Sequence, residues 1–288
     1  MTYGDWYSQY IQLYKRKIAD KTRESYARLH QLVSPVLAGR ELGEILPDDI
    51  QRALIAAEDN AGSRQAQLAY ALLHAVFRRA VRSRLLQYNP VDGVDKPSHD
   101  AMPGRAIIGD DWQLLQPVID ADLAFCLMAR AGLRRGEVLG LRWSDVDIRS
   151  CVIRVSRQYQ RVKGHAVIVP PKSSAGVRSV PIDPALLPLI RAHYRLTPGA
   201  RVVSCSPETL RRRWKSAQLE AGLPADRLYR LHDLRHTFAT RLNLAGCNLR
   251  VLQYIIGHAD FNLTLSTYAH VGELAAISEY NRLAEALH

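Results

Sequence analysis

Apolar residues recur at helical spacing through most of the chain. In the first hundred residues this pattern predicts four helices: Tyr3–Lys17, Thr22–Leu37, a short one opened by Pro47, and a long one from Ser63 to about Leu85. We therefore expect a small helical bundle at the N-terminal end of the chain.

The long helix has the clearest buried face. Leu68, Leu72, Ala75 and Val76 follow the i, i+4, i+7, i+8 spacing of one helix face, and Ser63 is a suitable N-cap. This face is expected to pack on the other three helices.

A second pattern follows residue 106. Helical spacing returns over 110–117 and 121–131, and residues 151–159 then alternate with period two, which predicts a strand. Short β segments at 165–169 and 177–182 flank a turn rich in Pro, Ser and Gly that contains Lys172, which indicates a small antiparallel sheet. From Pro184 onward the pattern is helical again. The fold class predicted is mainly α with a small antiparallel β-sheet, an α+β fold.

The domain boundary is predicted from punctuating residues. Residues 89–97, and then Met102-Pro103-Gly104, are dense in Pro, Gly and Asp, which break periodic structure. We expect a helical domain at 1–95, a linker at 96–105 and a second domain at 106–288.

The composition indicates a globular protein. The 288 residues are 47% hydrophobic and 23% charged, values typical of globular proteins. No apolar run approaches the ~18–20 residues of a membrane span, and no secretion signal opens the chain, so we expect a soluble, cytoplasmic protein. The four cysteines lack CxxC spacing and favour small buried thiols over a zinc knuckle or a redox pair.

The charge is basic and unevenly distributed. The net charge is +11; the first 100 residues hold 14 basic and 12 acidic side chains, whereas the remaining 188 hold 25 and 16. Residues 60–91 contain no acid, and a basic helix there is suited to phosphate contact. These features favour a polyanion as partner. The candidate contact residues are Arg64, Arg78, Arg79, Arg82, Arg211, Arg212 and Arg213.

Three segments of the second domain carry groups suited to a phosphate. Gly132-Leu133-Arg134-Arg135-Gly136-Glu137 places Arg134 and Glu137 at i, i+3 on a helix start. His232 and Arg235 project from one helix face, where both can bind one anion. Ile256-Gly257-His258 is followed by Tyr268.

Each segment also has an ordinary structural interpretation. Arginines of a basic protein are usually solvated, and a single histidine or tyrosine usually packs. His232 and His236 have the i, i+4 spacing of a zinc pair, but Asp233 stands where a metalloprotease has its glutamate, and the sequence indicates no third ligand. We therefore predict no metal site.

Taken together and in this order, the motifs resemble those of the tyrosine recombinase (phage integrase) family over essentially the whole chain. The stretches that carry the resemblance are Gly132–Glu137, Leu141–Val146, Lys172, His232–Thr240, and Gly257-His258 ten residues before Tyr268. The N-terminal helices are similar to the family's core-binding domain. The resemblance implies that both domains clamp one DNA duplex.

The resemblance also implies the role of each residue. Tyr268 is the expected nucleophile, Arg134 and Arg235 clamp the phosphate, and Glu137 orients that clamp. The assisting groups are Lys172, His232 and His258. Such groups suit the chemistry, because a phosphodiester under attack gains negative charge, and tyrosine, with a pKa of ~10, needs a base such as His232. Lys172 is expected to protonate the leaving 5′ oxygen.

The implied reaction is site-specific recombination through a 3′-phosphotyrosine and a Holliday junction, without metal, ATP or any other cofactor. The implied assembly is a homotetramer on paired double-stranded DNA sites, with accessory DNA-bending or directionality proteins as further partners. The apolar pattern of Leu274, Ile277, Leu283 and Leu287 is consistent with a C-terminal tail that docks on a neighbouring protomer; the alternative is that it folds back on its own domain.

Several alternatives stay open. Lys163 lies in the same β region as Lys172, and Ile256 stands where the family usually has leucine. The chain begins directly with the core-binding domain, so it is either a simpler two-domain recombinase or one shortened from a longer integrase with an arm-binding domain. Two other functions remain: a DNA-binding regulator or degenerate integrase without catalysis, and a relaxing enzyme similar to type IB topoisomerases.

Overall fold

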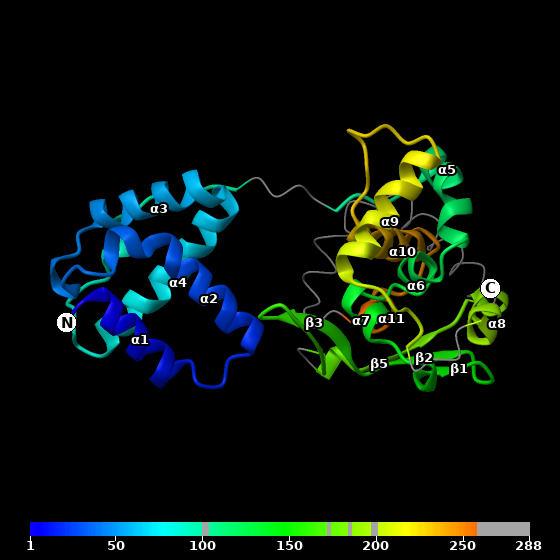
Figure 1. The fold of residues 1–288 in the computed structure, drawn as a ribbon, viewed down its shortest axis with the longest axis horizontal. Coiled ribbons are helices and arrows are strands. Elements are labelled where there is room, and N and C mark those ends of the chain that lie inside the picture. The colour runs from blue at the N-terminus through cyan, green and yellow to red at the C-terminus, as the bar shows by residue number, and fades with distance from the viewer. Residues whose placement is uncertain (100–103, 172–173, 184–185, 197–200, 258–288) are drawn as a thin grey trace, which may run out of the picture. The chain divides into compact units, whose positions relative to one another are not determined.

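The computed structural model describes residues 1–99, 104–171, 174–183, 186–196 and 201–257. The chain divides into two compact units, Met1–Met102 with Arg161–His165, and Pro103–Gln160 with Ala166–His288. Each unit is described by itself (Figure 1). Among the described residues, no helix has the length and apolar character needed to cross a membrane.

The first unit is a helical bundle. Its helices are listed here in chain order: α1 (Tyr3–Tyr14), α2 (Asp20–Leu37), the 3-10 turn η1 (Leu42–Glu44), α3 (Pro47–Ala61), α4 (Ser63–Arg82) and the 3-10 turn η2 (Pro90–Gly93). Aromatic residues of α1 supply much of its core: Tyr3 and Trp6 are buried, and the Trp6 indole N–H donates to the Val76 carbonyl at 3.1 Å. This bond ties α1 to α4 and gives the buried indole N–H a partner.

Two local expectations for this bundle are wrong. The helix opened by Pro47 is not short but has 15 residues, because Ile50, Leu54 and Ala57 continue its buried face. Ser63 is not an N-cap: Gly62, at φ 84°, occupies that position, and the Ser63 hydroxyl lies 3.2 Å from His99 Nδ1. A glycine adopts this backbone conformation without steric cost.

The second unit combines helices with two small sheets, except that Arg161–His165, where β3 ends and β4 begins, group with the first unit. In chain order its elements are α5 (Gly109–Asp120), α6 (Leu123–Arg130), α7 (Arg135–Gly140), η3 (Trp143–Asp145), β1 (Val146–Asp147), β2 (Val152–Val155), β3 (Gln158–Val162), β4 (His165–Val169), η4 (Ser174–Gly176), β5 (Arg178–Pro181), α8 (Leu187–Leu196), α9 (Pro207–Glu220), α10 (Leu231–Leu244) and α11 (Leu249–Ile256). The predicted mainly helical α+β fold is confirmed.

The sheet expectation needs one correction. Residues 151–159 form not one strand but two, broken at Ser156 and Arg157, and the two strands join different sheets. β2 pairs antiparallel with β1 and β5, with Ile153 opposite Val180, whereas β3 pairs with β4. The Arg157 guanidinium donates to Asp145 at 3.1 Å, an interaction across 12 residues that alternation alone does not reveal.

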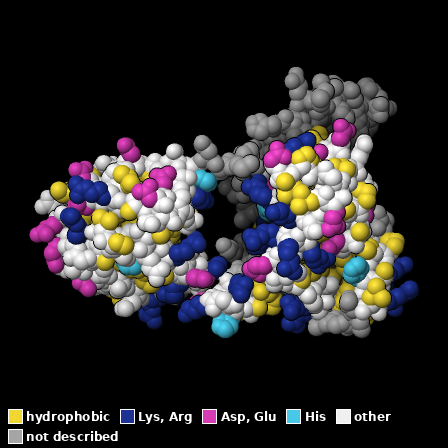
Figure 2. All heavy atoms as spheres, turned by 45° about the horizontal axis from the view of Figure 1, so that its top comes forward, with side chains coloured by type: hydrophobic (Ala, Val, Ile, Leu, Met, Phe, Trp, Pro, Cys, Tyr) yellow, Lys and Arg dark blue, Asp and Glu magenta, His cyan; other side chains and the backbone are white. Residues whose placement is uncertain are grey.

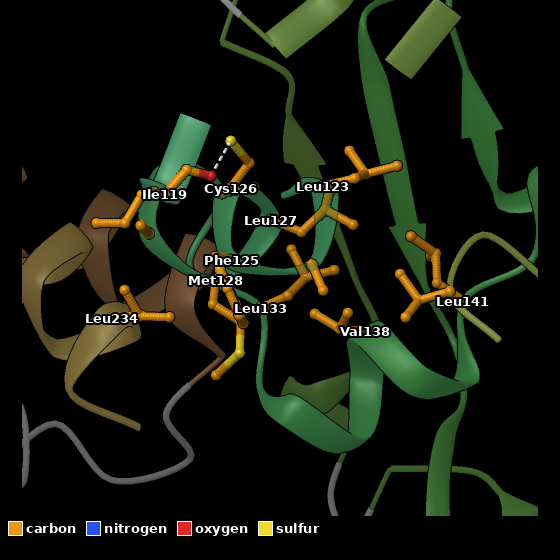
Figure 3. Packing of buried hydrophobic residues seen from close by; sticks show 14 of the residues in the cluster. Ile119, Leu123, Phe125, Cys126, Leu127, Met128, Leu133, Val138, Leu141 and Leu234 are labelled. Atoms are coloured by element: carbon orange, nitrogen blue, oxygen red, sulfur yellow. Dashed lines mark hydrogen bonds between the residues drawn. The ribbon is translucent and has the colours of Figure 1, made fainter. Parts of the chain in front are cut away.

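Helix α6 is the centre of the second core. All its residues except Arg130 are buried, and Figure 3 shows their side chains packed between α7 on one side and Leu234 of α10 on the other. The Cys126 thiol lies against the Ile119 carbonyl of α5 at 3.1 Å. Cys126 is thus the buried thiol that was expected, but Cys151, Cys205 and Cys247 are only partly buried.

Substitution of Leu234 tests this packing. Leu234 of α10 is fully buried in the core around α6. Leu234→Ala should therefore lower the free energy of unfolding by about 2–5 kcal/mol, because it leaves a cavity. Urea denaturation followed by circular dichroism measures the change. Leu244→Ala on the same helix is the control, because Leu244 is 52% exposed and its loss should cost little. Equal effects of the two substitutions would contradict the packing described.

Candidate active site

Arg134 and Glu137 meet at the start of α7. Arg134 is the N-cap, and its backbone N–H donates to Glu137 Oε2 at 2.8 Å while its Nη1 donates to Oε1 at 2.9 Å. An acidic side chain three residues after the N-cap satisfies a free backbone donor and suits the positive end of the helix. The i, i+3 pairing predicted from the sequence is therefore present.

The Glu137 carboxylate is buried yet charged. Burial by itself raises its pKa, but the hydrogen bonds and charge of Arg178, together with those of Arg134, outweigh this and hold the pKa below its ordinary value. Arg178 of β5 donates through Nη1 to Oε1 at 3.0 Å and through Nη2 to Oε2 at 2.9 Å. The carboxylate therefore lies between two guanidinium groups from different elements.

Arg178 is the residue that sequence reasoning missed. Its side chain is fully buried, and it occupies an inward position of β5 together with Val180. An arginine in phase with an apolar strand position is a signal that period-two analysis can find, because a buried charge requires a partner.

Helix α10 carries His232 and Arg235. Its first turn is held by Asp233, which is buried and accepts from the backbone N–H groups of Arg230 at 2.7 Å and Arg105 at 3.3 Å. A hydrogen bond of 2.8 Å from the Ile107 N–H to the Thr237 hydroxyl adds a second link. The segment 105–107 is thus attached to the helix that presents His232 and Arg235.

His236, one turn after His232 on α10, has a packing contact outside its own helix. The His236 ring lies beside the backbone of Gly104, where an added Cβ would come within 3.3 Å of the ring. Among the described residues, no group of three or more His, Cys, Asp or Glu side chains is placed to hold a metal ion.

The loop before α7 and helix α10 approach each other closely at Gly132. This glycine has φ 64°, and a Cβ there would lie 2.4 Å from Phe238 Cδ1. Its carbonyl accepts from Arg235 Nη1. Gly132 and Phe238, which belong to two different sequence motifs, are therefore in direct contact. Only glycine adopts this backbone conformation without steric cost and leaves room for the Phe238 ring.

The two candidate clamp arginines converge at the end of α11. Arg134 Nη2 donates to the carbonyl of Gly257 at 2.7 Å, and Arg235 Nη2 donates to the carbonyl of Ile256. Gly257 itself ends the helix in the left-handed conformation. Arg134, Glu137, Arg235 and the Gly257 end of the third motif are therefore brought together from three separate segments.

His232 belongs to the same electrostatic environment. Its pKa is lowered first by burial and then by the positive charge of Arg235, with a smaller contribution from Arg134. The imidazole is consequently neutral at pH 7, which is the form that accepts a proton.

Three predicted site residues, Lys172, His258 and Tyr268, lie outside the described residues. The alternative to Lys172, Lys163, occupies the β3–β4 turn at φ 48°, next to Gly164 at φ 80°. Tyr254 lies on α11, 58% exposed, with its hydroxyl 3.4 Å from the Ser179 N–H.

The candidate DNA-contact arginines are on α4 of the first unit and on α9 of the second unit. Arg64, Arg78 and Arg82 are exposed on α4, whereas Arg79 is half-buried with its guanidinium 3.8 Å from the Tyr14 ring centre. Arg211, Arg212 and Arg213 are exposed on α9, and Arg213 pairs with Asp122. Figure 2 shows Lys and Arg side chains gathered on the visible surface of the second unit.

Comparison with known proteins identifies the class. Residues 116–274 match the model of the phage integrase family. The integrase of prophage phiRv2 from Mycobacterium tuberculosis is 30% identical over 95% of this chain and 76% of its own length. The transposase of transposon Tn916 from Enterococcus faecalis is 27% identical over 86% of this chain and 68% of its own.

Solved structures agree on the fold. The Tn1549 transposon integrase in complex with transposon right end DNA superposes with a TM-score of 0.82, at 24% identity, over 99% of this chain and 100% of that one. A lambda integrase dimer bound to a core site gives 0.67, at 19% identity, over 91% and 97%. The chain belongs to the phage integrase family, whose members are tyrosine recombinases, as its motifs predicted.

The depressed pKa of His232 leads to a prediction. Arg134→Gln should raise this pKa toward the ordinary 6.5, because it removes one positive charge, while burial and Arg235 still hold it below that value. His236 is the internal control: its pKa is lowered by burial and Arg230, without a contribution from Arg134. NMR titration of histidine-labelled protein measures both midpoints.

The sign of the effect on stability follows from the same shift. Since folding depresses the pKa of His232, the unfolded state binds more protons than the folded state as the pH falls below 6.5. The free energy of unfolding therefore decreases as the pH falls through this range. A shift of both histidines together in Arg134→Gln would indicate a rearranged helix instead of a lost charge.

Proposed function

We propose that this chain is a site-specific recombinase that cuts and rejoins double-stranded DNA through a covalent 3′-phosphotyrosine. The observation that carries the proposal is the convergence of Arg134 and Arg235 on the adjacent carbonyls of Gly257 and Ile256, directly before His258 in the sequence. Two guanidinium groups at one point suit a phosphate that gains charge during attack.

The proposed first step is strand cleavage. The Tyr268 oxygen attacks the scissile phosphorus, its proton passes to neutral His232, and the bond from phosphorus to the 5′ oxygen breaks. Lys172 protonates that leaving oxygen, and His258 assists at the phosphate. Arg134 and Arg235 stabilise the non-bridging oxygens, and Glu137 orients Arg134 through the two bonds described above.

The proposed second step reverses the first with a different strand. A 5′ hydroxyl of a second duplex attacks the phosphotyrosine, reseals the strand and releases Tyr268, so the bond energy is conserved without ATP, metal or another cofactor. Two such exchanges pass through a Holliday junction. A lambda integrase tetramer bound to a Holliday junction is among the structures similar in fold, and it supports a homotetramer as the proposed assembly.

The proposed domain roles follow the same pattern. Residues 1–95 would form the core-binding domain, 96–105 the linker and 106–288 the catalytic domain, so that both domains hold one duplex. The exposed arginines of α4 and α9 would contact its phosphates. The segment after Tyr268 would dock on a neighbouring protomer, and DNA-bending or directionality proteins would assist assembly.

Trapping on a nicked suicide substrate tests the nucleophile. Nicked duplexes from the genomic flanks of the gene, followed by denaturation in SDS and mass spectrometry, should give a DNA-linked peptide that carries Tyr268. Tyr268→Phe should bind DNA as the wild type does and form no adduct. An adduct in that variant would move the nucleophile to Tyr254 or Tyr280, and strong binding without any adduct would favour a non-catalytic DNA-binding protein.

Arg134→Lys tests the clamp. Lysine keeps the charge but cannot present the planar guanidinium fork, so single-turnover cleavage should fall by about 10²-fold or more. DNA affinity should fall only slightly, because one phosphate contact is a small part of the interface. An equal loss of affinity and cleavage would contradict a role in the transition state.

Products that join two duplexes would distinguish recombination from relaxation of one duplex.

A further inference from the structure

The Arg178 guanidinium donates hydrogen bonds through all three of its nitrogens, although the sequence predicted no role for this residue. Besides its two bonds to Glu137, its Nε donates to the carbonyl of Ile255 at 2.6 Å and its Nη1 to that of Gly176 at 3.3 Å. The side chain is fully buried. Its guanidinium therefore joins β5, α7 and the end of α11 at one point.

Three arginines bind three successive carbonyls at the end of α11. Arg178 donates to the carbonyl of Ile255, Arg235 to that of Ile256, and Arg134 to that of Gly257. The last carbonyls of a helix have no intrahelical donors and form its negative end, so guanidinium groups suit this place. Two of the three arginines are the proposed phosphate clamp.

The Glu137 carboxylate links Arg178 to Arg134. Oε1 accepts from Nη1 of both arginines, and Oε2 accepts from the Arg134 backbone N–H and from Arg178 Nη2. Without Arg178, a carboxylate that is 3% exposed would keep one guanidinium partner, Arg134, which is 33% exposed. We expect Arg134 to be drawn toward that carboxylate, because a buried charge is costly unless it is paired.

The surroundings of Gly257 show how closely the Arg178 side chain packs against the end of α11. At φ 64°, a Cβ on this residue would lie 3.0 Å from both Cδ and Nη1 of Arg178 and 2.9 Å from the Ala175 carbonyl oxygen. The arginine thus packs directly against the last backbone unit before His258. A shift of its side chain changes the space in which that backbone lies.

We infer that Arg178 is a positioning residue of the recombinase, which sets the Arg134 guanidinium through Glu137 and anchors the end of α11 through the Ile255 carbonyl. This inference rests on the proposed function, since Arg134 matters here as part of the phosphate clamp. Arg178 itself is not required to touch DNA.

Arg178→Lys in the full-length protein is the first test. Lysine keeps the charge but lacks the geometry to bind both Glu137 oxygens and Ile255. On the site found by trapping, single-turnover cleavage should fall by about 10²-fold while the Kd for DNA changes less than about threefold. Arg130→Lys is the matched control: Arg130 binds Asp120 through Nε at 2.8 Å and Nη2 at 2.7 Å, and has no bond to the site described above. It should cleave at the wild-type rate.

A modified substrate distinguishes a positioning role of Arg178 from a general loss of enzyme structure in the variant. A methylphosphonate at the scissile position replaces one charged non-bridging oxygen by a methyl group, so cleavage depends less on the clamp. The ratio of wild-type to Arg178→Lys rates should narrow from about 10²-fold to within about tenfold on this substrate. An equal ratio on both substrates, or wild-type cleavage by Arg178→Lys, would overturn the inference.

The double variant Glu137→Gln with Arg178→Met guards against misfolding. It removes both buried charges together, which is much less disruptive than leaving one unpaired. It should unfold at a urea concentration near that of the wild type and still cleave slowly. Cleavage at the wild-type rate in this variant would show that positioning by Arg178 is dispensable.

Hydrogen exchange tests the anchor without catalysis. In Arg178→Lys, amides of residues 249–257 should exchange about tenfold faster than in the wild type, and those of α9 should not change. Unchanged exchange at 249–257 would overturn the inference. If the wild type itself forms no adduct, the proposed function fails, and this measurement still decides whether Arg178 anchors α11.

Discussion

A single buried carboxylate organises the candidate active site. Glu137 is nearly inaccessible to solvent, and it stays charged because Arg134 and Arg178 supply four hydrogen bonds to its two oxygens. Breaking such a cluster at one partner leaves an uncompensated charge in the protein interior. The position of Arg134 is therefore determined by burial and charge pairing that involve a strand more than forty residues away in the sequence, and not only by its own helix.

The end of α11 is the second constraint, and Arg134 is a hydrogen-bond donor in both places. Arg134 and Arg235 donate to the carbonyls of Gly257 and Ile256, and the proposed reaction needs those guanidinium groups at a phosphate. A guanidinium has five N–H donors, so one group can hold backbone and ligand together. In this arrangement the guanidinium groups proposed to bind phosphate also hold the backbone at Ile256 and Gly257, directly before His258 in the sequence.

Close packing explains why small residues occur in the motifs. Gly132 lies against Phe238 of another motif and Gly257 lies against Arg178 of β5, and in both cases an added Cβ would crowd that side chain. Each glycine also has a positive φ, which other residues adopt at a cost. The motifs thus carry, besides chemistry, the steric conditions that let α7, α10 and α11 approach each other.

The sequence by itself determined the helical periodicity, the pairing of Arg134 with Glu137, the motif order and hence the family, because these depend on local spacing and residue type. Only the tertiary structure decided that residues 151–159 divide between two sheets, that His236 packs on Gly104, and that Arg178 completes the Glu137 cluster. These features depend on contacts between residues far apart in the chain. Burial is what makes those contacts energetically decisive, and local spacing does not specify which distant groups meet.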